Sequence, residues 1–105
     1  MSTKKLKHMV IFCLKHSTGS PEEKKFLKDI EKTLASIPVV KNFETVRQVS
    51  AKNDYEFGIY MEFDSEQDFQ KYETHPIHID FVENRWRKEV KRRLVIDFEA
   101  IKSKA

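Results

Sequence analysis

Apolar and polar residues alternate along several stretches of the chain, and this period of two predicts four β-strands. The clearest strand covers residues 55–63, where one face is apolar throughout and consists of Tyr55, Phe57, Ile59, Met61 and Phe63. A strand over 90–98 also has one apolar row, whereas a weaker strand over 39–49 is diluted by charged and amide side chains. The strand predicted over 5–15 differs from these because both of its faces are apolar.

The two faces of this first strand carry different apolar sets. One row contains Leu6, His8, Val10, Phe12 and Leu14, and the other contains Met9, Ile11 and Cys13. A strand that is apolar on both sides needs a covering layer on each side of its sheet. The helices of so small a chain can cover one face only, so we expect a second copy of the chain to cover the other. The predicted partner is therefore the protein itself, in a homodimer formed through the sheet faces.

Two helical regions separate the strands. The sequence Ser20-Pro21-Glu22-Glu23 combines an N-cap hydroxyl, a proline at the first helical position and a capping-box glutamate, which predicts a helix up to about Ser36. Its buried stripe is expected to consist of Phe26, Leu27, Ile30 and Leu34. The second helical region is capped by Asp64 or Ser65 and precedes the last strand.

The order strand, helix, strand, strand, helix, strand predicts an α+β fold. It is the order of a ferredoxin-like βαββαβ sandwich, with four antiparallel strands and the helices on one face. The chain has 105 residues and no internal repeat or linker, so we expect a single domain over 1–105. Its 39% hydrophobic and 35% charged residues supply both a core and a solvated surface.

Charge and cysteine content narrow the functional classes. The net charge of +3 comes from 20 basic and 17 acidic residues that are interspersed along the chain. The basic stretch 85–93 is interpreted as a solvated helix end and an edge strand. No apolar run reaches the length of a signal peptide or a membrane helix, so we expect a cytoplasmic protein without a membrane partner. The single cysteine, Cys13, lies in an apolar run and is expected to be a buried thiol.

Residues 72–81, Y-E-T-H-P-I-H-I-D-F, carry the side chains best suited to chemistry. Tyr72 can donate a proton and a neutral His78 can accept one, so a pocket that holds both can run acid/base chemistry without a cofactor. His75 precedes Pro76, and we expect it to end the helix with its ring against a backbone carbonyl. Two histidines three apart around a proline do not reproduce a zinc motif, so no metal site is expected.

Four segments resemble a known family in their order and spacing. They are K-H-M-V-I-F-C-L-K at 7–15, I-P-V-V at 37–40, the block from Phe63 to His78, and V-I-D-F at 95–98. The chain resembles the stress-responsive dimeric α/β-barrel (Dabb) domain family, including its olivetolic acid cyclase-like proteins. The resemblance implies that two ferredoxin-like subunits pair their sheets face to face and close a barrel.

The same resemblance implies a site. It assigns acid/base roles to Tyr72 and His78, and it makes His8 a pocket histidine on the first strand. Where the cyclases carry a second pocket histidine on the third strand, this chain has Phe57. The walls of a pocket between sheet and helices would come from the core, and we expect them to include Phe26, Leu27, Phe57, Ile59, Phe81 and Val82.

These observations predict a homodimer with a small apolar pocket in each subunit, which binds a small carbonyl-containing or aromatic molecule. A cyclase-like enzyme that uses Tyr72 and His78 for aldol or enolisation chemistry is an alternative, as is a cofactor-free monooxygenase. A non-catalytic structural stress protein is another alternative. RNA binding is disfavoured, because Glu56 stands where an RNA-recognition strand has glycine and Ile59 stands where it has a stacking ring.

Overall fold

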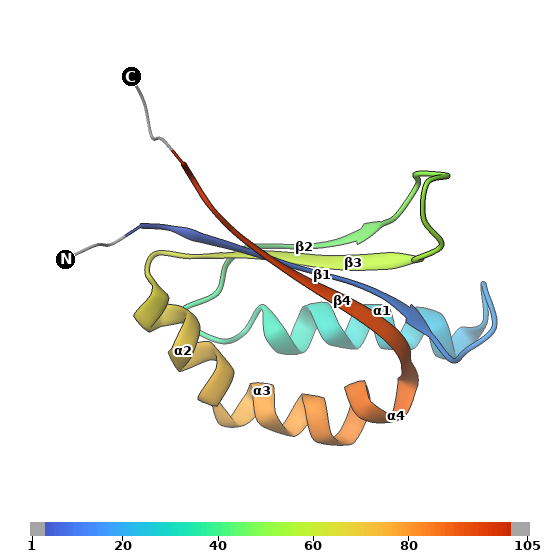
Figure 1. The fold of residues 1–105 in the computed structure, drawn as a ribbon. Coiled ribbons are helices and arrows are strands. Elements are labelled where there is room, and N and C mark those ends of the chain that lie inside the picture. The colour runs from blue at the N-terminus through green and yellow to red at the C-terminus, as the bar shows by residue number, and fades with distance from the viewer. Residues whose placement is uncertain (1–3, 102–105) are drawn as a thin grey trace.

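The computed structural model describes residues 4–101, which form one four-stranded sheet with all the helices on one face (Figure 1). The elements are β1 Leu6–Leu14, α1 Pro21–Leu34, β2 Lys41–Arg47, β3 Phe57–Phe63, α2 Glu66–Thr74, α3 Pro76–Phe81, the π-helical turn η1 Val82–Trp86, α4 Arg87–Glu89 and β4 Val90–Glu99. The strand order is β2-β3-β1-β4 and every neighbouring pair is antiparallel. The predicted ferredoxin-like α+β fold is confirmed, although β2 and β3 begin two residues later than expected.

The core lies between the sheet and the helices. The β1 row with His8, Val10, Phe12 and Leu14 faces the helices and is buried. The Phe12 ring contacts the rings of Phe26 on α1 and Trp86 on η1, with centroids 6.1 and 5.1 Å apart. Both phenylalanines have no exposed surface, so this aromatic cluster joins β1 to both helical regions.

Helix α1 starts as its sequence predicts, with one change in the capping contacts. The Ser20 hydroxyl accepts a hydrogen bond from the Glu23 amide at 3.2 Å. The Glu23 carboxylate accepts from the amide of Gly19 at 2.9 Å, one residue before the Ser20 amide of a regular capping box. Glu23 is thereby buried, whereas Leu27, which was expected in the buried stripe, is only half-buried.

The second face of the sheet carries the other apolar row of β1. Met9 pairs with Ile96 and Ile11 pairs with Leu94 across the β1–β4 ladder. Within residues 4–101 no helix covers this face, and Leu94 and Phe98 keep 45% and 50% of their surface exposed (Figure 1). Cys13 is 3% exposed, so the predicted buried thiol is confirmed. The face is therefore apolar and open within the subunit.

The chain breaks its helix at His75-Pro76, as the sequence predicts. His75 is extended, with φ −67° and ψ 135°, and Pro76 is the first residue of α3. The ring of His75 does not meet a carbonyl as expected; instead its Nδ1 accepts the amide hydrogen of Ile77 at 3.1 Å. The reason is that the first amides of α3 need acceptors, which makes His75 the N-cap of the second piece.

A π-helical turn continues this second piece. The Arg87 amide donates to the Val82 carbonyl, five residues earlier, so one extra residue is inserted into the helix. The turn brings Phe81 and Trp86, also five residues apart, against the same Phe26 ring at centroid distances of 5.7 and 6.3 Å.

No helix within residues 4–101 is both long and apolar enough to cross a membrane.

Candidate functional site

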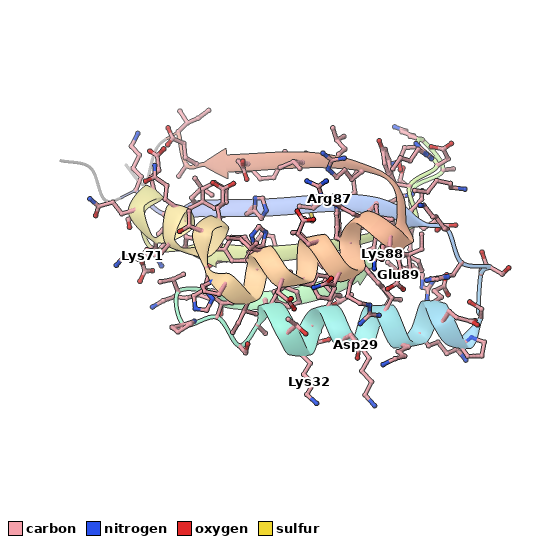
Figure 2. All side chains as sticks on the ribbon, turned by 90° about the horizontal axis from the view of Figure 1, so that it is seen from below. Asp29, Lys32, Lys71, Arg87, Lys88 and Glu89 are labelled. Carbon is pink, nitrogen blue, oxygen red and sulfur yellow. The ribbon has the colours of Figure 1, made fainter. Side chains whose placement is uncertain are left out.

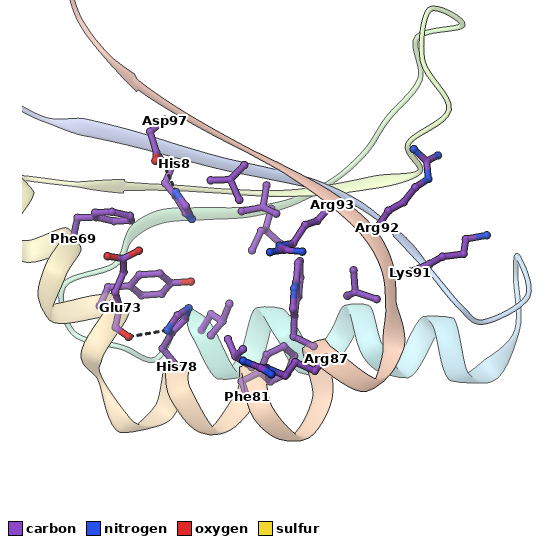
Figure 3. A pocket seen from close by; sticks show the side chains of 18 residues that line it. His8, Phe69, Glu73, His78, Phe81, Arg87, Lys91, Arg92, Arg93 and Asp97 are labelled. Carbon is purple, nitrogen blue, oxygen red and sulfur yellow. Dashed lines mark hydrogen bonds and ion pairs between the residues drawn. The ribbon is translucent and has the colours of Figure 1, made fainter.

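A cavity of about 850 Å³ lies between the inner face of the sheet and the helices α2, α3 and η1 (Figure 3). Its inner end is lined by buried side chains, namely His8, Val10, Leu34, Ile59, Tyr72 and Phe81. Its other end lies along β4 and is lined by exposed side chains that include Arg87, Arg93, Val95 and Asp97. The cavity therefore has a largely apolar interior and a charged mouth. The mouth is accessible because β4 is an edge strand.

His8 is positioned by a partner that lies 89 residues away in the sequence. The β1–β4 register places Asp97 directly opposite His8, and Asp97 Oδ1 lies 2.5 Å from His8 Nδ1. His8 is 7% exposed, so this carboxylate is the acceptor for its Nδ1–H group. That hydrogen bond leaves Nε2, which has no hydrogen-bond partner among residues 4–101, as the ring atom able to act in the cavity.

His78 is oriented by a backbone group that the helix break sets free. In a continuous helix the Glu73 carbonyl would accept from the Ile77 amide, but that amide donates to His75. The free carbonyl lies 3.1 Å from His78 Nδ1 and accepts its hydrogen (Figure 3). Burial lowers the pKa of His78 below its ordinary value of 6.5. At neutral pH the ring is therefore uncharged, with a basic Nε2.

Tyr72 lies between the two imidazoles. Its ring centroid is 4.4 Å from that of His78 and 6.1 Å from that of His8. The side chain is 2% exposed, and its hydroxyl makes no hydrogen bond within residues 4–101. Burial raises the pKa of Tyr72, so the phenol keeps its proton and remains available as a hydrogen-bond donor. The three groups expected to form the site, His8, Tyr72 and His78, thus line one cavity.

The expected pocket walls are only partly those of this cavity. Ile59, Phe81 and Val82 line it, whereas Phe26, Leu27 and Phe57 do not. Phe26 lies deeper, against Phe12 and Phe81, and Leu27 follows it on the half-buried side of α1. Phe57 lies near the other end of the sheet, under the Arg47 guanidinium, where it borders a separate hollow of about 190 Å³.

Several lining residues were not foreseen from the sequence. Glu73, Arg87, Arg93 and Asp97 all border the cavity. The alternation along β4 indicates that Arg93, Val95 and Asp97 share one face of the strand, opposite the apolar row of Leu94, Ile96 and Phe98. Assigning that row to the cavity requires the β1–β4 register. Within residues 4–101, no group of three or more His, Cys, Asp or Glu side chains is arranged to hold a metal ion.

Comparisons with known proteins agree with this architecture. Residues 6–100 match the family described as Stress responsive A/B Barrel Domain, or Dabb. A Dabb family protein with a ferredoxin-like fold from Mesorhizobium loti is 43% identical, with a TM-score of 0.93 over 94% of this chain and 99% of that chain. A dimeric protein of unknown function from Bacteroides fragilis is 23% identical, with a TM-score of 0.70 over 91% of this chain and 96% of that chain.

A more distant structure shares the fold. The hydroxynitrile lyase from Passiflora edulis is 14% identical, with a TM-score of 0.78 over 99% of this chain and 100% of that chain. None of the curated proteins matches the sequence significantly. The family match extends over almost the whole sheet and helix arrangement described above. The chain therefore belongs to the stress-responsive A/B barrel domain (Dabb) family.

Proposed function

We propose that each subunit of a homodimer binds a small carbonyl-containing or aromatic molecule in the cavity beside Tyr72. The convergence of one phenol and two imidazoles among the apolar side chains at the inner end of the cavity carries this proposal. Small-molecule sites are usually concave and apolar, with a few polar groups that fix the orientation of the ligand. A ligand carbonyl would accept the hydrogen bond that the Tyr72 hydroxyl does not make within residues 4–101.

The same groups support acid/base chemistry as a second function of the site. His78 Nε2 would remove a proton next to the carbonyl, while the Tyr72 hydroxyl stabilises the enolate oxygen that forms. The neutral ring of His78 and the protonated phenol are the forms that this reaction requires. The hydroxynitrile lyase from Passiflora edulis has the same fold, which supports the reaction class by analogy only.

A second copy of the chain is the proposed cover for the open face of the sheet. The face exposes Leu94 and Phe98 beside the half-buried Met9, Ile11 and Ile96. Two solved relatives, from Bacteroides fragilis and Thermobifida fusca, are described as dimeric. Burial of this apolar row in a two-fold interface would complete the second layer that a sheet with two apolar faces needs.

Replacing Tyr72 with phenylalanine is expected to weaken ketone binding. We chose acetophenone as the probe and ethylbenzene, which lacks the carbonyl oxygen, as its reference. The variant keeps the ring but loses one hydrogen bond, so the affinity for acetophenone should fall about threefold to tenfold. Affinities are measured by NMR titration of the cavity amides.

Tyr55→Phe is the matched control, because Tyr55 lies outside the cavity and its ring packs under Arg92. This variant should bind acetophenone as tightly as the unmodified protein does. Ethylbenzene should bind all three proteins with equal affinity. Equal acetophenone affinity of Tyr72→Phe and the unmodified protein would contradict a carbonyl contact at Tyr72.

The proton affinity of His78 can be measured directly. Burial lowers its pKa, so its NMR titration midpoint should lie below 6.5 in the folded protein. His78 therefore binds a proton more tightly in the unfolded chain than in the folded protein. Its contribution to the free energy of unfolding is constant above the unfolded-state pKa, and it is lost as the pH falls from the unfolded-state pKa through the folded-state pKa. The same titration in the urea-unfolded chain is the control, and equal midpoints would contradict burial of the imidazole.

A further inference from the structure

We infer that the ligand of the cavity is an organic acid, whose carboxylate is bound by Arg93 and Arg87 at the mouth while its carbonyl end lies at Tyr72. This inference rests on the proposed function and adds the substrate class to it. It starts from the distribution of charge around the cavity. The basic lining side chains lie on β4 and α4, and the inner end carries the acid/base groups among apolar side chains.

The alternation of β4 directs Arg93 toward the cavity and Arg92 away from it. Arg93 pairs with Phe12 in the ladder, on the helix side of the sheet, whereas Arg92 pairs with Cys13 on the opposite face. Figure 3 shows the Arg93 side chain extending into the space between β4 and the helices, whereas Lys91 and Arg92, which also border the cavity, extend away from that space. Arg93 is therefore the cation of β4 whose side chain extends into the cavity.

Arg93 is also a guanidinium without a partner. Among residues 4–101 it makes no hydrogen bond, ion pair or ring contact. Other arginines nearby are paired: Arg85 donates to Asp29 at 2.8 Å, and Arg92 donates to Asp54 at 2.7 Å. A guanidinium at the edge of an apolar cavity, with its donors unused, is well placed to bind a carboxylate through two parallel hydrogen bonds.

Arg87 provides a second positive charge on the opposite wall. It lines the same cavity, and Figure 2 shows it on the β4 side of its helix. Its one ion pair, with Glu83, has an Nε–Oε2 distance of 3.5 Å between two exposed side chains, a contact of little strength. Its remaining donors can therefore turn to a ligand without breaking a buried interaction.

The acidic lining residues do not neutralise these arginines. Asp97 Oδ1 is held by His8, and Glu73 lies on α2, beside the inner groups. The cavity is thus polarised, with acid/base groups at one end and free guanidinium donors at the other. A molecule with a ketone or aromatic ring at one end and a carboxylate at the other matches both ends, and the apolar surface of Val10, Val95 and Trp86 would contact the carbon chain between them.

The test uses aryl oxo acids of graded length. Each probe has a benzoyl group joined by two to five methylenes to a carboxylate, and each is paired with its uncharged primary amide. Affinities are measured by isothermal titration calorimetry at low and high salt. We expect one or more acids to bind at least about tenfold more tightly than the matching amide, because an ionised hydrogen-bond partner is stronger than a neutral one.

Arg93→Met should remove this preference, because the affinity for each acid should fall to about that of its matching amide. The matched control is Lys88→Met, which deletes a positive charge from the neighbouring helix α4 at an exposed side chain that does not line the cavity. Lys88→Met should keep the preference for acids. Arg93→Lys, which retains the charge but not the planar donor pair, should keep only part of it. Circular dichroism verifies that each variant is folded.

The outcomes separate this inference from the proposed function. If amides bind as tightly as acids and Tyr72→Phe weakens both, the cavity is a carbonyl site and the carboxylate inference is overturned. If Arg93→Met and Lys88→Met reduce acid binding equally, the preference is a general effect of net charge, which also overturns it. If neither acids nor amides bind at any chain length, both proposals fail.

Discussion

Replacing Leu94 with aspartate is expected to leave the protein as a single 12.5 kDa subunit at micromolar concentration, where we expect the unmodified protein to be a dimer. Leu94 lies opposite Ile11 on the open face of the sheet and keeps 45% of its surface exposed within the subunit. In the proposed dimer a carboxylate at this position would be taken out of water without a partner, which costs several kcal/mol. Light scattering and sedimentation velocity measure the result.

Val95→Asp is the matched control for this experiment. Val95 is the next residue of β4 and is 48% exposed, but it faces the cavity on the helix side of the sheet. A general effect of a new charge on the edge strand would act on both variants, whereas a face-specific effect acts on Leu94→Asp alone. A dimeric Leu94→Asp variant, or an unmodified protein that is monomeric at micromolar concentration, would contradict pairing through this face.

Phe12→Ala is expected to lower the free energy of unfolding by about 3–5 kcal/mol. Phe12 has no exposed surface, and its ring contacts Phe26, Phe57 and Trp86, so truncation opens a cavity among three rings that belong to different elements. For a domain of this size the loss is a large fraction of the total stability. Urea unfolding followed by circular dichroism measures it, at one fixed protein concentration because the proposed dimerisation would add to stability.

Val49→Ala provides the comparison for a position without packing. Val49 is 87% exposed and follows the end of β2, so its truncation should change stability by no more than about 0.5 kcal/mol. A loss below about 1.5 kcal/mol for Phe12→Ala would mean that the surrounding rings collapse into the space, contrary to a closely packed core.

The strands and their order could be predicted because their patterns are local. The unbroken apolar row of β3 and the two apolar faces of β1 were sufficient to identify both central strands. The limits of β2 were harder to place, because Asn42 adopts a positive φ of 52° and the β2–β3 register shifts between Lys41 and Glu44. Such an irregularity bends the strand and interrupts its pairing without leaving a clear mark in its hydrophobic pattern.

The π-helical turn could not be predicted from periodicity. Ile77 and Phe81 are four residues apart, as in a regular helix, but Trp86 follows Phe81 after five. A regular helix would turn Trp86 away from the Phe81 face. The extra residue in η1 restores the alignment, because packing against Phe26 outweighs the less favourable hydrogen-bond geometry.

The candidate site also contains some residues that could be predicted from the sequence and others that could not. Tyr72 and His78 are close in sequence, and His8 was suggested by the family resemblance, so their shared cavity could be expected. Asp97 and Arg93 could not be placed, because their positions follow from long-range pairing of β4 with β1. The sequence predicts solvated surface for the basic stretch 85–93. The β1–β4 register instead places Arg93 on the helix side of the sheet, at the cavity, and Arg92 on the opposite face.

The helices and the open apolar row lie on opposite sides of one sheet (Figure 1). If two subunits pair through the open side, a layer of backbone from each sheet separates their two chambers. Ligand binding in one chamber then leaves the affinity of the other unchanged, so a dimer should take up two ligand molecules with a Hill coefficient of about one.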